Sequence, residues 1–419
     1  MSEAASHAPG ETARATELSG VARFMKATEL DTRMLGMVGA LLIIWVVFHF
    51  LSGGLFLTPR NLWNLSVQSA SVAIMATGMV LVIVTRNIDL SIGSVLGFVG
   101  MVMGVTQAEF LPGLLGFGSP AIWVVALLVG VVAGVAIGAF QGYVIAFLKV
   151  PAFIVTLGGL LVWRGAAWWV TSGRTVAPMD ADFRLMGGGP DGSIGATWSW
   201  VFGLAAIALV AFMAWRNRSS RLRHGFPTKP VWVELLLFAV WAVLIVGFVL
   251  VMNAYTKPRS DIPRGIPVPV LILIAVVVGM SLISRITRFG RYVFAMGGNP
   301  RAAELSGIDV KKTTLLIFVI MGILCGIAAV ITTARLNAGA NSMGMLAELS
   351  VIAAAVIGGT SLAGGVGSIA GAILGAVIMQ SLENGMVLMG VSSAMRQVII
   401  GLVLIIAVWF DSMYKKNRR

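Results

Sequence analysis

Long apolar runs dominate the chain, and short polar or glycine-containing segments separate each run from the next. An α-helix needs about 20 mainly apolar residues to cross the hydrocarbon core of a bilayer. The runs predict twelve such helices, near residues 34–51, 62–85, 90–108, 121–147, 151–170, 199–215, 231–252, 267–284, 313–332, 349–363, 369–385 and 397–411. The pattern therefore predicts an all-α membrane protein built as a polytopic helical bundle.

The tenth and eleventh runs form one long stretch of small residues, which is interrupted by Gly364-Gly365-Val366-Gly367. A hairpin, a broken helix and a re-entrant segment are all compatible with this interruption. Irregular backbone is tolerated at membrane depth where protein covers it. The sequence leaves these three alternatives open.

Composition excludes a soluble enzyme. Of the 419 residues, 58% are hydrophobic and 11% are charged, whereas soluble domains have about 45–50% apolar and about 25% charged residues. The longest segments outside the runs are 1–33, 171–198 and 285–312, and each is shorter than the roughly 50 residues of a small domain. We therefore divide the chain into an N-terminal tail (1–33), a transmembrane domain (34–411) and a basic tail (412–419). The mixed charge and low hydrophobicity of the first tail predict disorder.

Basic residues are unevenly distributed between the two sides of the predicted bundle. The chain has 30 Lys and Arg; with both termini in the cytoplasm, 21 fall in cytoplasmic segments and eight in external ones. This bias has the direction of the positive-inside rule, so it predicts cytoplasmic termini. It also explains the net charge of +13 without a nucleic-acid partner, which would need a basic face on a soluble fold. The remaining cation, Arg164, lies among tryptophans and is interpreted as a snorkelling residue at the interface.

The residue types that usually carry catalysis or bind metals are scarce. Cys325 is the single cysteine, and His7, His49 and His224 are far apart in the sequence, so we predict no disulfide and no metal site. No Gly-Lys dipeptide occurs, which excludes the phosphate-binding loop that contains one. We predict no catalytic residue and no cofactor, and any ATP hydrolysis would belong to another polypeptide.

Two polar insertions lie close to predicted spans. Asp89 and Ser91 stand where the third helix should begin, and they can either cap that helix or contact a solute at a helix start. Glu383 and Asn384 lie at the end of the eleventh run. They can reach the membrane interface or line a pathway, because ionisable groups within membranes are often functional.

Glycine stripes inside the runs predict close contacts between helices. An example is Gly130-x-x-x-Gly134-x-x-x-Gly138, whose small residues allow two helix backbones to approach. A short internal echo also joins 89–97 to 361–371. Such an echo is the pattern expected when a transporter contains duplicated units.

The segment 285–312 contains the signals of a short helix. Asn299 can cap it, Pro300 suits its first turn, and Gly307 can end it. An ordinary basic loop is the alternative interpretation, but it leaves this order of residues unexplained. We favour a short amphipathic helix that serves as a docking element.

Four segments together resemble a known family. The core Ala302-Ala303-x-x-x-Gly307 resembles the coupling motif of ABC-importer permeases. The segments 87–94, 150–158 and 357–365 resemble signatures of the monosaccharide (ribose/xylose) branch of these permeases. Ribose-type permeases look like ten-span proteins, and the two extra runs here, 199–215 and 231–252, are similar to an insertion in xylose-type permeases. The external segment 257–264 is longer than this resemblance implies, which leaves the sugar open.

The resemblance implies a type II importer-like permease with two extra spans, in the bacterial inner membrane. Its expected cargo is D-xylose; ribose, galactose or a branched-chain amino acid are alternatives, and an ion-coupled sugar carrier is a competing class. Its expected partners are a second copy of the chain, a cytoplasmic ATPase subunit, a periplasmic sugar-binding protein and membrane lipid. The residues implied to couple the permease to the ATPase are Gly290, Arg291, Asn299, Pro300, Arg301, Ala302, Ala303, Glu304 and Gly307.

Overall fold

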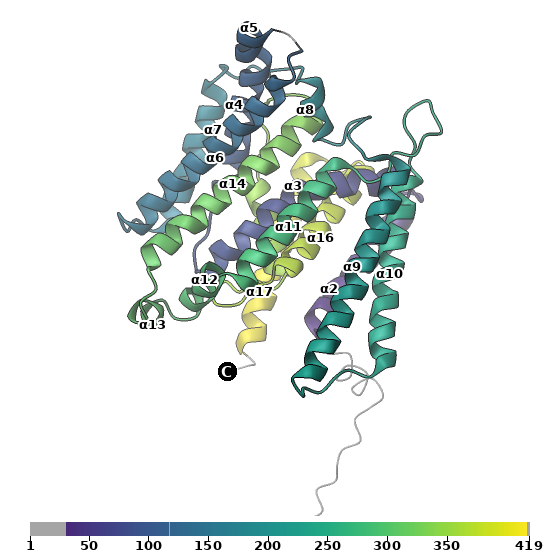
Figure 1. Ribbon diagram of the computed structural model, residues 1–419. Coiled ribbons are helices and arrows are strands. Elements are labelled where there is room, and N and C mark those ends of the chain that lie inside the picture. The colour runs from purple at the N-terminus through teal and green to yellow at the C-terminus, as the bar shows by residue number, and fades with distance from the viewer. Residues whose placement is uncertain (1–30, 117, 417–419) are drawn as a thin grey trace, which may run out of the picture.

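The computed structural model describes residues 31–116 and 118–416, and Figure 1 shows how its helices are arranged. The described residues form helices joined by loops, with no strand among them. The helices are α2 (Thr32–Leu51), α3 (Pro59–Val84), α4 (Ile92–Val105), η1 (Thr106–Phe110), α5 (Leu111–Leu115), α6 (Ala121–Ala146), α7 (Ala152–Trp169), α8 (Ala181–Leu185), α9 (Gly195–Arg223), α10 (Val231–Asn253), α11 (Val268–Ile286), α12 (Arg288–Gly298), α13 (Pro300–Leu305), α14 (Val310–Leu336), α15 (Ala347–Ile357), α16 (Ile369–Leu388) and α17 (Ser393–Lys416). The predicted all-α fold class is confirmed.

Ten helices of the described part are long and apolar enough to cross a membrane, and each coincides with one of the predicted runs. Two shorter apolar helices, Ala347–Ile357 and Ser393–Trp409, coincide with the tenth and twelfth runs. A polytopic helical membrane protein is therefore confirmed, while the count of twelve spans stays a prediction.

Several predicted boundaries differ from the structure. The loop predicted at 216–230 is shorter, because α9 continues to Arg223 and ends where Gly225 adopts a φ of +69°. The basic tail predicted at 412–419 begins as helix, because α17 continues to Lys416. Residues 1–30 of the predicted N-terminal tail and residues 417–419 lie outside the described part of the chain.

The tenth predicted span, 349–363, is too long. α15 ends at Ile357, since Gly359 and Gly364 adopt φ values of +99° and +86° that continue the chain as a turn. With 11 residues, α15 has a length of about 16 Å at 1.5 Å per residue, which is roughly half of the hydrocarbon core. It is followed by the longer helix α16, and the two helices pack against each other as a hairpin.

A non-helical segment, 337–346, precedes α15 and lies along α4. Gly104 of α4 is next to Gly339, Gly97 is next to Met343, and Gly93 is next to Gly344. The order of these contacts shows that the segment runs antiparallel to α4 before α15 begins. The tenth element is thus a broken one, a non-helical segment followed by a half-length helix.

Contacts among the helices occur in matching pairs. α6 packs against α14 as α16 packs against α3; α4 packs against α7 as α15 packs against α17; and α4 packs against α14 as α15 packs against α3. If α3, α4, α6 and α7 are exchanged for α14, α15, α16 and α17 in that order, each of these contacts becomes the other member of its pair. This is the arrangement of a transporter built from two repeats. The counterpart of α4 is therefore α15. The short sequence similarity between 89–97 and 361–371 does not mark the repeat, because the first segment leads into α4 and the second leads into α16.

The glycine stripes lie where the matched helices cross. A Cβ at Gly134 of α6 would overlap the carbonyl group of Gly322 in α14, and a Cβ at Gly138 would overlap the main chain of Phe318. The structure therefore confirms the predicted packing role of this glycine stripe.

The hairpin formed by α9 and α10 stands at the edge of the bundle beside α2 (Figure 1). Its attachment lies near the end of α10, where Val249 joins Trp63 of α3 in a buried apolar cluster. In the loop that follows, the guanidinium carbon of Arg264 lies 4.8 Å from the ring centre of Trp63 and 4.5 Å from that of Tyr255. This stacking of a cation between two aromatic rings fixes the loop to the bundle.

Candidate functional site

The segment between α11 and α14 folds into the short helices α12 and α13. Asn299 caps α13, because its side-chain oxygen accepts a hydrogen bond from the backbone N–H of Ala302 at 3.1 Å. Pro300 occupies the first turn, and Gly307, with a φ of +84°, follows the end of the helix. The short helix expected from Asn299, Pro300 and Gly307 is therefore present.

α12 is held firmly against the base of the bundle. A Cβ at Gly290 would overlap the carbonyl group of Ser284, so glycine permits this close approach. Arg86, in the loop after α3, donates hydrogen bonds to the carbonyl groups of Gly297 at 3.1 Å and Gly298 at 2.8 Å. A displacement of α12 would therefore also displace the end of α3.

The exposed part of these two helices forms what we name the α12–α13 surface. It consists of Arg288, Arg291, Tyr292, Ala295, Asn299, Pro300, Arg301, Ala302, Glu304, Leu305 and Gly307. Leu305 is 84% exposed, so the surface combines basic side chains with one large apolar side chain. Of the residues expected to couple to an ATPase, Gly290 and Ala303 are buried and position the helices, whereas the others are exposed.

The connection from α13 to α14 is also fixed by a cap. The carboxylate of Asp309 accepts a hydrogen bond from the backbone N–H of Lys312 at 2.9 Å. This bond holds the pKa of Asp309 below its usual value. The cap therefore joins the α12–α13 surface to the first turn of α14.

Asp89 and Ser91 belong to a buried polar cluster where the chain enters α4. Oδ1 of Asp89 accepts hydrogen bonds from the backbone N–H of Ser91 at 2.9 Å and from its Oγ at 2.6 Å. Gln141 of α6 donates to Ser91 Oγ at 3.0 Å, and Thr156 of α7 donates to the carbonyl group of Ile88 at 3.1 Å. Ser91 holds the cap position of α4 without a side-chain cap bond. Asp89 thus stabilises the turn before the helix rather than capping the helix itself.

Arg164 does not snorkel to the interface, so that interpretation is wrong. Its Nη1 donates to the carbonyl groups of Asn341 and Met343, at 2.9 Å each. These carbonyls belong to the non-helical segment before α15 and have no helical partner, so they need a donor from elsewhere. The side chain turns inward because this segment supplies acceptors there.

Glu348 lies in the first turn of α15, buried opposite Gly93 of α4. Its carboxylate interacts electrostatically with Arg164 and Asp89. Its Oε2 has no hydrogen-bond partner among the described residues. No group of three or more His, Cys, Asp and Glu within the described ranges could hold a metal ion.

A second polar region, which we name the polar pocket, lies toward the opposite end of the bundle from α12 and α13. It has a volume of about 310 Å³. Its polar lining comes from α3, α14, α15, α16 and α17: Gln68, Ser71, Thr332, Arg335, Ser350, Gln380, Glu383, Ser393, Arg396 and Gln397. Leu346, Ala347 and Ser350 at the start of α15 also line it.

The donors and acceptors of the polar pocket are only partly paired with one another. Gln380 donates to Glu383 Oε2 at 3.0 Å, and Thr332 donates to Ser71 at 3.1 Å. Arg335 interacts electrostatically with Glu383. The Nε of Arg396 is buried and has no hydrogen-bond partner among the described residues. Hydroxyl groups of a solute would therefore find both donors and acceptors here.

The structure separates Glu383 from Asn384, two neighbours that sequence reasoning grouped together. Glu383 lines the polar pocket. Asn384 points to α3, where its Oδ1 accepts a hydrogen bond from Nδ2 of Asn61 at 2.9 Å. Asn384 is consequently a packing residue, and of the two only Glu383 lines the polar pocket.

Several residues of these sites were not found from the sequence. Glu348 directly precedes the tenth run, Gln380 is a polar residue within the eleventh, and Arg335 and Arg396 lie beside predicted span ends. Polar residues at the ends of runs are common, so position alone did not distinguish them from interfacial residues.

A bundle of membrane helices with a polar pocket at one end and a pair of short, exposed helices at the other has the features of a membrane transport protein. The family model described as the branched-chain amino acid transport system permease component matches residues 61–408. The chain belongs to this family.

Individual relatives are similar over nearly the whole chain. The xylose transport system permease protein XylH of Escherichia coli (strain K12) is 38% identical over 411 residues, which cover 98% of each chain. The protein of that name from Haemophilus influenzae (strain ATCC 51907 / DSM 11121 / KW20 / Rd) is 38% identical over 394 residues, 94% of this chain and 99% of its own. The ribose import permease protein RbsC of Escherichia coli (strain K12) is 33% identical over 396 residues, 94% and 98% of the two chains. No solved structure matches. The resemblance to monosaccharide-importer permeases is thereby confirmed.

We predict that Asp89→Ala lowers the amount of folded protein at least threefold while leaving sugar preference unchanged. The change removes the acceptor for two buried donors of Ser91, and each unsatisfied donor costs about 1–3 kcal/mol. Asp89→Asn keeps one acceptor and should restore part of the yield. Size-exclusion chromatography of a fluorescent fusion measures the yield, and competition between labelled xylose and ribose measures preference. A changed preference at normal yield would show that Asp89 contacts the solute.

Proposed function

We propose that this chain is the membrane-spanning permease subunit of an ATP-driven importer that carries D-xylose from a periplasmic binding protein into the cytoplasm. The observation that carries the proposal is the 38% identity to a xylose permease over 98% of both chains. As a member of a permease family the chain is a multi-pass transport subunit and not an enzyme. ATP hydrolysis is assigned to a separate subunit.

The α12–α13 surface is proposed to receive that ATPase subunit on the cytoplasmic side. The basic residues Arg288, Arg291 and Arg301 on the surface support a cytoplasmic location under the positive-inside rule. Both termini then lie in the cytoplasm, and a second copy of the chain completes the pathway. Closure of the ATPase would move α12 and α13 together. This movement would be transmitted to the bundle, because Arg86 and the close contact at Gly290 bind α12 to it.

The polar pocket is proposed as the part of the pathway that opens toward the binding protein. Its volume of about 310 Å³ lies at the lower end of the range of about 300–1,000 Å³ for small-molecule sites. Its mixture of amide, hydroxyl and charged groups suits a polyhydroxylated solute. Because no single group dominates binding, the solute can also dissociate from the pocket again.

The first test is uptake of labelled D-xylose in cells with and without the gene. We expect gene-dependent uptake that is lost on ATP depletion and survives collapse of the proton gradient. Loss of uptake with the gradient instead would identify an ion-coupled carrier. Gene-dependent uptake of ribose rather than xylose would leave the importer class intact and assign the cargo to the other branch.

We predict that Gly307→Arg reduces ATP-dependent uptake more than tenfold while the protein remains inserted and folded. Open space surrounds the Cα of Gly307, so a long cationic side chain would project from the α12–α13 surface into a docked partner. Gly307→Ala is the matched control, because both variants carry the strain of a φ of +84° and only the arginine adds bulk. Equal loss in both variants, or normal uptake in Gly307→Arg, would contradict docking at this surface.

We predict that Gln68→Leu lowers the initial rate of xylose uptake about tenfold at unchanged protein level. Gln68 lines the polar pocket, and losing one hydrogen bond of about 1.4 kcal/mol to the solute corresponds to a factor of ten. Asn64→Leu, one turn away on α3 and outside the pocket lining, is the matched control. Uptake that is equally reduced in both variants would remove the polar pocket from the pathway.

A further inference from the structure

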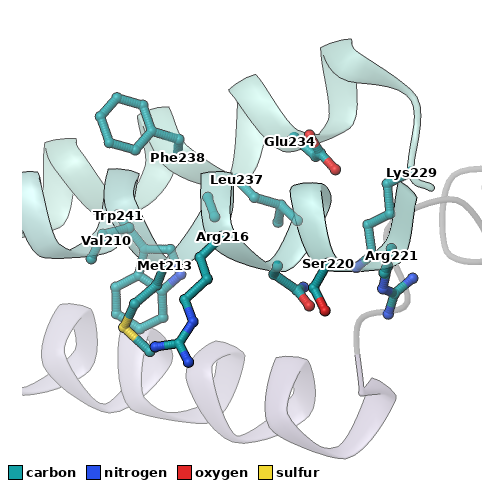
Figure 2. A pocket seen from close by; sticks show the side chains of 12 residues that line it. Val210, Met213, Arg216, Ser220, Arg221, Lys229, Glu234, Leu237, Phe238 and Trp241 are labelled. Atoms are coloured by element: carbon teal, nitrogen blue, oxygen red, sulfur yellow. The ribbon is translucent and has the colours of Figure 1, made fainter. Parts of the chain in front are cut away.

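A pocket of about 690 Å³ on the α9–α10 hairpin is lined by charged side chains whose partners lie in the hairpin itself (Figure 2). Glu234 in this lining accepts a hydrogen bond from Arg218 at 2.8 Å. Arg221, also in the lining, donates to the carbonyl group of Pro227 at 3.4 Å. A different arrangement of charges lies behind one wall of the polar pocket.

That wall is a short stretch of chain around the start of α15. The other lining residues of the polar pocket belong to helices, whereas this stretch begins in the non-helical segment before α15. We name residues 344–350 the α15 wall. Its lining residues are Gly344, Met345, Leu346, Ala347 and Ser350.

Arg164 of α7 holds the chain at the point where the α15 wall begins. The side chain of Arg164 is not part of the pocket lining. Its Nη1 donates to the carbonyl groups of Asn341 and Met343 at 2.9 Å each, and Met343 directly precedes the wall. Gly97 of α4 makes room for this guanidinium, because a Cβ there would lie 3.3 Å from Nη1. Arg164 therefore contacts the wall from the side that faces away from the pocket.

Glu348 belongs to the α15 wall, but it is also absent from the pocket lining. Its carboxylate lies against Gly93 of α4, beside the carbonyl group of Gly344. Its buried Oε2 has no hydrogen-bond partner among the described residues. Arg164 attracts this carboxylate, whereas Asp89 repels it. Because a buried charge needs compensation, Arg164 serves the wall twice, as a hydrogen-bond donor and as a counter-charge.

We propose that Arg164 is a positioning residue for the solute pathway, which holds the α15 wall against α4 through two carbonyl groups and through Glu348. This inference rests on the proposed function, in which the polar pocket is part of the pathway. Without Arg164, two carbonyl groups lose their donor and Glu348 loses its counter-charge. The wall then moves, while the lining residues on continuous helices keep their places. Since Arg164 does not reach the pocket, it acts on the solute only through the wall.

The test measures how fast a small, water-soluble methanethiosulfonate labels an introduced cysteine in the purified full-length protein. The natural Cys325 is 1% exposed, so it contributes little background. Ser350→Cys reports on the α15 wall. Val72→Cys on α3 is the matched position, because Ser350 and Val72 both line the pocket and are 6% and 8% exposed. We expect Arg164→Met to raise the labelling rate about fivefold at Ser350→Cys and less than twofold at Val72→Cys, because local opening depends on the contacts that hold a segment.

Two further variants show whether the donors and the charge of Arg164 hold the wall. Arg164→Lys keeps the charge and can donate to both carbonyl groups, so labelling at Ser350→Cys should stay within twofold of its rate with arginine. Arg218→Met removes an arginine with carbonyl and carboxylate partners from the hairpin and should leave both rates within twofold. Equal increases at Ser350→Cys and Val72→Cys, an unchanged rate at Ser350→Cys, or equal rates in Arg164→Met and Arg164→Lys would each overturn the proposal.

Glu348→Gln tests the wall if Arg164→Met does not fold. It keeps the size of the side chain and removes the charge that Arg164 attracts, so labelling at Ser350→Cys should rise about threefold. Arg164→Met combined with Glu348→Gln leaves no uncompensated carboxylate at this position. The double variant should therefore yield more folded protein than Arg164→Met alone, with labelling still fast because the carbonyl groups lack their donor. An unchanged rate in Glu348→Gln would remove Glu348 from the arrangement and contradict the proposal.

Uptake measurements separate this inference from the proposed function. We expect Arg164→Met to raise the KM for D-xylose about fivefold, since a displaced wall weakens solute binding, at a protein level within twofold of normal. Faster labelling at Ser350→Cys with a normal KM would overturn the positioning role. Faster labelling in a protein that takes up no sugar even with Arg164 in place would overturn the proposed function and leave the position of the wall established.

Discussion

The need to satisfy backbone polar groups inside a bilayer determines how this protein is built. Helices meet that need by themselves, but the chain leaves the helical state before α4 and again before α15. At the second break Arg164 donates to two carbonyl groups, and at the first the side chains of Asp89 and Thr156 serve the backbone. Each break is covered by protein, which is the condition under which irregular backbone survives in a membrane.

The break before α15 also connects the two ends of the molecule. The first residues of α15 line the polar pocket, and the turn that follows its last residue contacts α12, where a Cβ at Gly297 would overlap the main chain of Gly365. A half-length helix without flanking helical turns can shift as a unit more readily than a continuous span. The contacts at its two ends therefore connect the polar pocket to α12 through a single element of 11 residues.

Local features of the fold followed from the sequence, whereas contacts between distant segments did not. The cap, first turn and stop of α13 depend on Asn299, Pro300 and Gly307, which lie within nine residues of one another, so spacing alone predicted them. The role of Arg164 depends on carbonyl groups 177 and 179 residues further along the chain, and no local pattern reveals an acceptor there. Glu383 was found as a polar insertion, but its separation from Asn384 depends on which neighbouring helix each side chain faces. The length of the tenth span was overestimated because apolar residues continue past the point where positive φ angles at glycine end the helix.

The α9–α10 hairpin stands outside the repeated architecture, and this explains how it can differ in purpose. The matched contacts involve α3 to α7 and α14 to α17, while α9 and α10 lie between these units in the chain. Neither helix contributes to the polar pocket or to the α12–α13 surface. The hairpin is therefore structurally separate from the polar pocket and from the α12–α13 surface. What it adds is a large exposed apolar surface, with basic residues near the turn between its two helices.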